Sequence, residues 1–203
     1  MSLPLRSTAV PALPPAGELA GALRPVLAAR RRVALEGAQL RAGVLVLLYD
    51  HLGEPHLVLT KRTETVAHHR GEVSLPGGRW EPGDHDLLAT ALRETEEEIG
   101  VPAAGVEVVG PLDDVHSPAS NFTVSPWVGV LDVRAELAPA ADEIARVLEV
   151  RLADILAADL LIPAIPDRAT LRYPLHGEDV WGLTARILHN LSAHVRQALA
   201  AAP

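Results

Sequence analysis

The chain contains no cysteine, so disulfide bonds and thiolate chemistry are both excluded. It also lacks a long apolar run, because the longest, Val44 to Tyr49, is far too short to cross a bilayer. Residues 1–16 hold four prolines and no apolar segment of the kind found in secretion signals. Basic residues are in deficit, with 26 acidic and 18 basic side chains and a formal charge of −8, which argues against nonspecific nucleic-acid binding. We expect a cytoplasmic protein without nucleic-acid or membrane partners.

The length of 203 residues suits one compact domain with a substantial core. We expect residues 1–37 to form a leader and a helix packed on a domain at 38–203, in a monomer or homodimer. The apolar spacing near Leu19 and Leu23 predicts that helix, interrupted at Pro25. Residues 30–32, three arginines that follow it, are interpreted as solvent-exposed charges at the helix end.

Strand-like and helix-like segments alternate along the rest of the chain. An almost continuous apolar run at 42–50 predicts a strand buried on both faces, with 57–62 as its hairpin partner. Further strands are expected at 106–110, 122–131, 146–150 and 171–175, and further helices at 152–158 and 180–199. In the last helix, Trp181 is interpreted as a packing anchor. This order predicts an α/β (α+β) fold in which helices cover both sides of a sheet.

The most informative segment is an acidic helix after a glycine loop. Glu94, Glu97 and Glu98 lie at i, i+3 and i+4 and therefore on one side of a helix. An apolar face is expected at Leu88, Leu92, Thr95 and Ile99. Carboxylates crowded in this way repel one another unless a cation lies among them, and hard oxygen ligands suit Mg²⁺ or Mn²⁺.

Two neighbours distinguish this helix from an ordinary solvated acidic face. Arg93 lies four residues before Glu97 and can hold its carboxylate in one rotamer, which favours metal binding. Gly100 follows the last acidic turn, where a left-handed glycine commonly ends a helix.

The segment 77–101 resembles the signature box of the Nudix hydrolases. The charged and glycine positions from Arg93 to Val101 all match, and Thr95 replaces the usual aliphatic residue. The isolated glutamate of the box falls at His85, because the loop carries one extra residue. Asp84 or Asp86 is expected to take its place.

A narrower resemblance lies upstream of the box. The segments 59–63 and 69–78, with Leu75 where Phe is usual, are similar to the motif of the coenzyme A pyrophosphatase branch. Together with downstream matches, the resemblance covers roughly residues 38–192, nearly a whole domain of ordinary size. It implies a Nudix fold with a mixed sheet between helices, and cleavage of coenzyme A or a derivative into adenosine 3′,5′-bisphosphate and a 4′-phosphopantetheine fragment.

The resemblance also implies roles for single residues. Glu94 and Glu98 would be the principal ligands of Mg²⁺ or Mn²⁺, with Glu97 and the backbone at Gly78 as further contacts, and Arg93 would orient them. Either Glu97 or Glu143, on a later loop, would act as the general base.

Basic side chains before the box are the candidates for substrate recognition. Lys61, Arg62, His69 and Arg70 form a local basic patch in an acidic protein, suited to the phosphates of coenzyme A. Alternatively, Arg62 braces a nearby glutamate, Glu64 or Glu72. Two other functions stay open: hydrolysis of ADP-ribose or a dinucleotide such as NADH, and nucleotide binding without turnover.

Overall fold

The computed structural model describes residues 12–35, 40–64, 71–117, 121–159 and 171–201. Its helices are α1 (Ala16–Ala29), α2 (Leu87–Ile99), α3 (Leu152–Asp159) and α4 (Gly182–Ala201), with a short 3-10 helix, η1 (Ala103–Gly105). Its strands are β1 (Leu40–His51), β2 (Glu54–Arg62), β3 (Val73–Ser74), β4 (Gly77–Arg79), β5 (Glu107–Pro111), β6 (Val115–Ser117), β7 (Phe122–Val130), β8 (Ile144–Arg151), β9 (Tyr173–Leu175) and β10 (Glu178–Val180).

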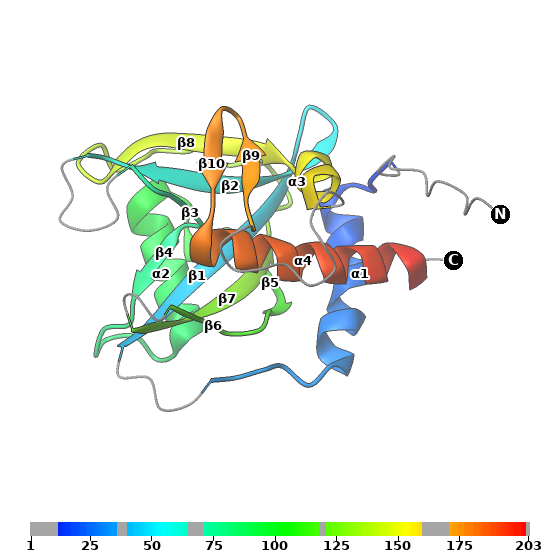
Figure 1. The fold of residues 1–203 in the computed structure, drawn as a ribbon, viewed down its shortest axis with the longest axis horizontal. Helices are drawn as coiled ribbons and strands as arrows, with labels where there is room; N and C mark the ends of the chain where they lie inside the picture. Colours follow the sequence, from blue (N-terminus) through cyan, green and yellow to red (C-terminus); the bar gives the residue numbers. More distant parts are fainter. Residues whose placement is uncertain (1–11, 36–39, 65–70, 118–120, 160–170, 202–203) are drawn as a thin grey trace.

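A mixed sheet around β1 forms the centre of the fold (Figure 1). Its main path runs β3-β2-β1-β7-β5, while β8 pairs with β2, β4 with β1, and β6 with β7. The β1–β7 pair is parallel, and the other pairs are antiparallel. The predicted hairpin of β1 and β2 is confirmed, with His51 opposite Glu54 at its turn.

Alternate side chains of β1 enter two different cores, as the period of a strand requires. Val46 and Leu48 pack with α1, α3 and α4, whereas Leu45, Leu47 and Tyr49 pack with α2. Both faces of the sheet are therefore covered by helices, and the predicted mixed sheet between helices is confirmed. Figure 1 shows α4 crossing one face, with α1 beside its C-terminal half.

Helix α1 packs against α4 and β5 and differs from its prediction in one respect. It is not interrupted at Pro25, which lies inside the helix. Proline removes one backbone hydrogen bond and disfavours a helix interior. Here Leu19, Leu23 and Leu27 are all buried on the two sides of Pro25, and their packing stabilises the continuous helix.

The three arginines after α1 are not uniformly solvated, contrary to the prediction. Arg31 is exposed, but Arg30 pairs with Asp113 and Arg32 pairs with Asp114. The Asp114 side chain has no solvent exposure, so its charge requires a partner. These ion pairs fasten the segment after α1 to the region just before β6.

Helix α4 begins at Gly182, two residues later than predicted, because Val180 belongs to β10. Trp181 is 50% exposed, and the prediction that it anchors the helix is therefore wrong.

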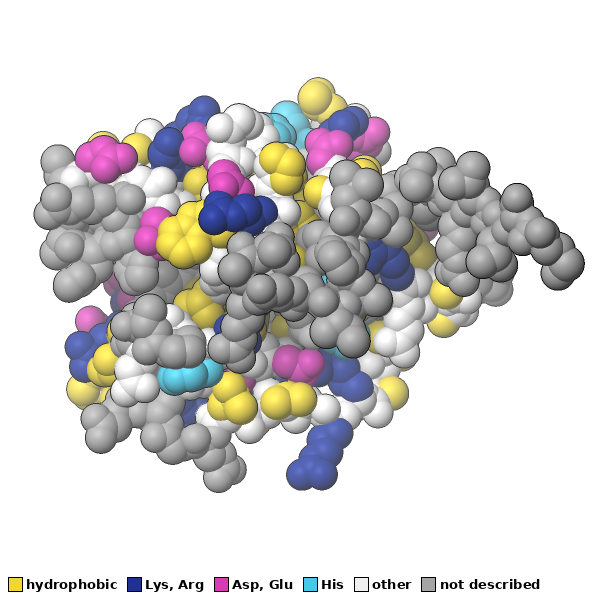
Figure 2. Space-filling model, in the orientation of Figure 1, with side chains coloured by type: hydrophobic (Ala, Val, Ile, Leu, Met, Phe, Trp, Pro, Cys, Tyr) yellow, Lys and Arg dark blue, Asp and Glu magenta, His cyan; other side chains and the backbone are white. Residues whose placement is uncertain are grey.

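Among the described residues, no helix combines the length and apolar character needed to span a membrane. Figure 2 shows acidic and basic side chains lying close together on the face with α4.

Candidate active site

Helix α2 carries the Nudix box, and residues next to it in the sequence cap both of its ends. The Asp86 side chain caps its start by accepting a hydrogen bond from the Ala89 N–H at 2.8 Å. Gly100 ends it in the left-handed conformation, at φ 73°, and its N–H donates to the Glu96 carbonyl at 2.9 Å. The predicted C-terminal glycine cap is confirmed.

The three box glutamates occupy three different environments, although they start from one side of the helix. Side-chain exposure is 5% for Glu98, 19% for Glu94 and 58% for Glu97. Glu98 belongs to the buried face of α2, together with Thr95 and Ile99, so this face is less apolar than predicted. A buried carboxylate must be hydrogen-bonded or paired, and Glu98 accepts the Gly77 N–H at 3.2 Å.

Glu94 lies directly against the backbone of the glycine loop. A Cβ atom added at Gly78 would come within 2.4 to 2.6 Å of the Glu94 carboxyl group. Only glycine allows this approach without displacement of the carboxylate. Strand β4, which pairs with β1 through Gly77, Gly78 and Arg79, holds the loop in this position.

Arg62 connects the helix to a distant loop. Its Nη1 lies 3.2 Å from Glu98 and its Nη2 lies 3.2 Å from Glu143. The structure therefore brings Glu143 beside the box carboxylates, although it lies far beyond Glu98 in the sequence. The described contacts of the Arg62 guanidinium are with these two acids, whereas the Glu72 carbonyl accepts the Arg62 backbone N–H at 3.1 Å.

Arg93 joins the helix to the loop that precedes it. Its guanidinium donates to Glu97 at 2.8 Å, as predicted, and lies 3.0 Å from Glu94. It also donates two hydrogen bonds to Asp84, at 2.9 and 3.0 Å, and one to the Arg79 carbonyl at 3.2 Å. Asp84 is thus the loop acid that contacts Arg93, Asp86 caps the helix, and the His85 side chain is 94% exposed.

The candidate substrate residues are only partly assembled beside the box. Lys61 Nζ lies 3.0 Å from both carboxylate oxygens of Glu178 on β10, and Arg146 Nη2 lies 2.7 Å from one of them. Glu178 therefore offsets charge in the predicted basic patch. His69 and Arg70 lie outside the described residues.

Burial and crowding set the protonation chemistry of the site. Burial raises the pKa of Glu98 to about 7, and nearby Glu94 and Glu143 add to the rise. Burial also raises the pKa of Glu94. By contrast, the hydrogen bonds from Arg93 hold the pKa of Asp84 well below its usual range. The negative charge of Glu94 and Glu98 is thus poorly compensated, whereas that of Asp84 is stabilised.

These donors fit a hard divalent cation such as Mg²⁺ or Mn²⁺. Two carboxylates with unfavourable charge beside a glycine backbone offer the oxygen ligands that such ions take. Over the described ranges, no three His, Asp or Glu side chains converge as a complete metal-binding group. Glu97 is held by Arg93, and Glu98 by Arg62 and Gly77. Glu94, Glu98 and the backbone at Gly78 lie together and are the principal candidate donors, and the more exposed Glu97 is a further candidate.

The family follows from comparison with known proteins. The chain matches the NUDIX domain family model over residues 39–171. It belongs to the Nudix hydrolase family. It is similar to proteins named uncharacterized Nudix hydrolase NudL, at 35% identity. In Pectobacterium atrosepticum the match spans 162 residues, or 77% of this chain and 83% of the relative. In Yersinia pestis it spans 161 residues, or 76% of this chain and 79% of the relative.

Solved structures agree on the Nudix fold. A Caenorhabditis elegans Ap4A hydrolase binary complex superposes with a TM-score of 0.53 at 18% identity, covering 78% of this chain and 98% of that one. The NUDIX domain of Shewanella oneidensis NrtR, complexed with ADP ribose, gives 0.53 at 19% identity, with 80% and 90% coverage. This Nudix hydrolase is an enzyme that acts on phosphorus-containing anhydrides.

Two contacts of this Nudix hydrolase are not predicted from the sequence. Asp84 and Asp86 are both candidates for the place of the box glutamate, and the structure pairs Asp84 with Arg93, while Asp86 takes the capping role that an aspartate directly before a helix favours. The neutralising contact of Glu178 with Lys61 spans 117 residues and has no local signal.

Proposed function

We propose that this Nudix hydrolase cleaves the diphosphate of coenzyme A or a derivative, giving adenosine 3′,5′-bisphosphate and a 4′-phosphopantetheine fragment. Support comes from segments 59–63 and 69–78, which resemble the coenzyme A branch. The observation that carries most weight is the contact of Arg62, from this motif, with the box residue Glu98. Residues of the motif and of the box thus belong to one site.

The chemistry is assigned to a small set of side chains. Glu94, Glu98 and the backbone at Gly78 would hold Mg²⁺ or Mn²⁺, which when bound polarises the phosphoryl oxygens and promotes attack by water. Arg93 orients the carboxylates. Lys61 and Arg62 would bind the phosphates of the substrate, with His69 and Arg70 as further candidates from the sequence motif.

A general base must take a proton from the attacking water. Glu143 is the candidate that we favour, because it lies across Arg62 from Glu98 and is 51% exposed, so water reaches it. Glu97 is the second candidate: it is ion-paired with Arg93, as Glu143 is with Arg62, and its side chain is 58% exposed.

A second candidate function is hydrolysis of ADP-ribose or a dinucleotide such as NADH. It is favoured by the pairing of Lys61 with Glu178, which lowers the positive charge available to a 3′-phosphate. Neither ADP-ribose nor NADH carries that phosphate.

Hydrolysis of coenzyme A, dephospho-coenzyme A, ADP-ribose and NADH with Mg²⁺ or Mn²⁺ tests both functions side by side, with Glu98→Gln as the inactive control. We expect turnover of coenzyme A at least about tenfold faster than that of its dephospho form, since a charge-assisted contact is worth about 1.5–3 kcal/mol. Faster turnover of ADP-ribose or NADH would replace the substrate assignment. No turnover of any compound would favour a nucleotide-binding role instead.

A further inference from the structure

A cavity lies beside the N-terminal end of α2. Its volume is about 510 Å³, within the range of small-molecule sites. Its walls come from the segment after α1, the start of β1, the loop before α2, and β7. Neither Glu94 nor Glu98 lines it, nor does Arg62 or Glu143. This cavity is therefore separate from the candidate active site.

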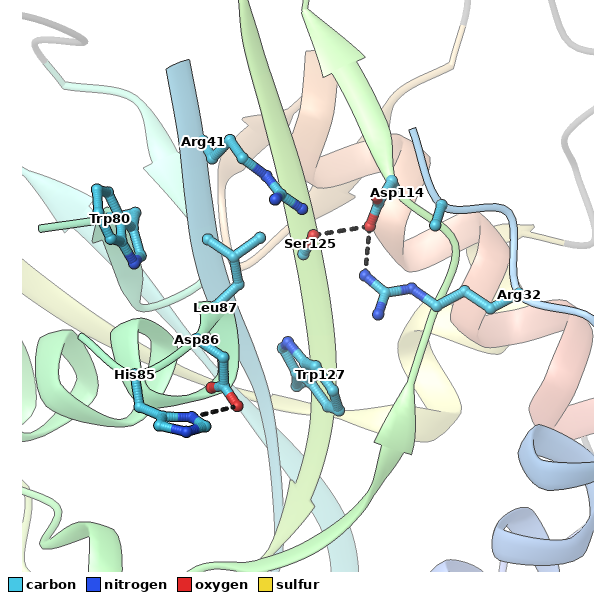
Figure 3. A pocket seen from close by; sticks show the side chains of 10 residues that line it. Arg32, Arg41, Trp80, His85, Asp86, Leu87, Asp114, Ser125 and Trp127 are labelled. Atoms are coloured by element: carbon cyan, nitrogen blue, oxygen red, sulfur yellow. Dashed lines mark hydrogen bonds and ion pairs between the residues drawn. The ribbon is translucent and has the colours of Figure 1, made fainter. Parts of the chain in front are cut away.

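Among the described residues, the charged groups of the cavity leave one cation, Arg41, without a partner. Asp114 is paired with Arg32 and accepts a hydrogen bond from Ser125 Oγ at 2.7 Å (Figure 3). Asp86 caps α2 and lies 3.4 Å from His85. Both carboxylates are thus engaged. Arg41 is exposed, and within the described part of the chain its guanidinium has no hydrogen-bond or ion-pair partner. With His85 neutral the formal charges of the lining cancel, and Arg41 is the cation that has no direct contact with an acid among the described residues.

Aromatic surface is concentrated in the same cavity. The whole chain has only three tryptophans, and two of them, Trp80 and Trp127, line it. Trp80 is 42% exposed, yet its position is fixed, because Nε1 donates to the Asp84 carbonyl at 3.1 Å and its backbone N–H donates to the Arg41 carbonyl at 2.9 Å. A fixed, exposed indole is a suitable stacking surface for a planar ring such as a nucleobase.

Trp127 contributes an unsatisfied donor. The Arg32 guanidinium lies 5.3 Å from the centre of its ring, which fixes the indole. Its buried Nε1 has no hydrogen-bond partner among the described residues. Figure 3 shows this nitrogen on the side of the ring toward Leu87 and Ser125, two other lining residues.

We propose that this cavity binds a nucleoside monophosphate, with its base against Trp80 and its phosphate paired with Arg41. The cavity volume, the exposed indole and the unpartnered guanidinium each match one part of such a molecule. The proposal does not depend on which substrate the box carboxylates cleave.

Adenosine 5′-monophosphate is the probe, titrated into the full chain by calorimetry in the presence of EDTA, so that divalent cations do not recruit it to the box carboxylates. We expect saturable binding, at least about tenfold tighter than binding of adenosine or of inorganic phosphate. Arg41→Ala should weaken it about tenfold or more, since it removes a charge-assisted contact. The exposed neighbour variant Arg31→Ala should bind as the unmodified protein does.

Two further variants make the result decisive. Trp80→Leu should also weaken binding by about tenfold, while Glu98→Gln should leave it unchanged. Thermal unfolding confirms that each variant is folded. The proposal would be overturned if adenosine 5′-monophosphate did not bind, or if inorganic phosphate alone bound equally tightly. It would also be overturned if Glu98→Gln lost binding while Arg41→Ala kept it.

Discussion

Asp84 accepts two parallel hydrogen bonds from the guanidinium of Arg93, one from Nε at 2.9 Å and one from Nη2 at 3.0 Å. This two-point contact fixes Arg93 at the point where it also reaches Glu94 and Glu97. The family pattern has a glutamate in this loop, and here a shorter acid, displaced by one position, contacts the box arginine.

The loop acid is testable with a matched pair of variants. Asp84→Asn should lower the rate of diphosphate hydrolysis about 10- to 100-fold, the usual cost of removing a group that orients a metal ligand. Asp86→Asn should stay close to the unmodified rate, because asparagine caps a helix as well as aspartate does. Steady-state kinetics with Mn²⁺ measures both, and equal losses would show that Asp84 has no special orienting role.

Gly78→Ala should reduce activity without unfolding the protein. The new Cβ would meet the Glu94 carboxyl group at 2.4 to 2.6 Å and displace it. Gly83→Ala is the matched control in the same loop, since a Cβ atom added there would meet no described atom within 4 Å. Activity is measured as a function of metal concentration. The metal concentration that gives half-maximal activity should rise at least about tenfold for Gly78→Ala and stay unchanged for Gly83→Ala. An active Gly78→Ala enzyme would mean that Glu94 moves freely.

The pH dependence of kcat distinguishes Glu143 from Glu97 as the general base. Glu143→Gln should lower kcat by about 10² to 10⁴ and remove the acidic limb of the kcat profile, because glutamine accepts no proton. Glu136→Gln, an exposed acid earlier on the same connection, is the control and should retain the limb. If Glu97→Gln loses the limb instead, the role belongs to Glu97.

Lys61→Ala should discriminate between substrates. If Lys61 leaves Glu178 to bind the 3′-phosphate, the variant should raise KM for coenzyme A about tenfold while changing that for dephospho-coenzyme A little. Arg151→Ala, a basic residue on β8 that pairs with Asp154, is the control and should affect neither. An equal change for both substrates would remove Lys61 from phosphate recognition.

Acid stability should depend on Glu149. The Arg134 guanidinium and the Tyr49 hydroxyl, 2.6 Å away, hold the pKa of Glu149 at about 2, below its usual value of 4.5. Because the folded pKa is lowered, this stabilisation is fully present above pH 4.5 and is lost as the pH falls toward 2. Glu149→Gln should therefore lower the free energy of unfolding by about 1–3 kcal/mol at pH 7. Denaturant unfolding at pH 7 and pH 3 should show a smaller difference between variant and parent at pH 3.

Local features of this protein were determined by its sequence. The acidic helix, its glycine cap and the Arg93–Glu97 pair depend on residues at most four apart, and helical geometry fixes such spacings. The buried central strand followed from a continuous apolar run, and the family box followed from contiguous residues. In each case the interacting groups are close in the chain, so the local backbone conformation decides their relation.

Only the tertiary structure decided which charges meet across the fold. It paired Arg62 with Glu98 and Glu143, and Lys61 with Glu178, in contacts that span 36 to 117 residues. It also kept α1 continuous through Pro25 and left Trp181 exposed, because packing with other elements outweighs local preference. Sequence spacing does not encode such partners, since they depend on which strand and loop ends the folded sheet brings together.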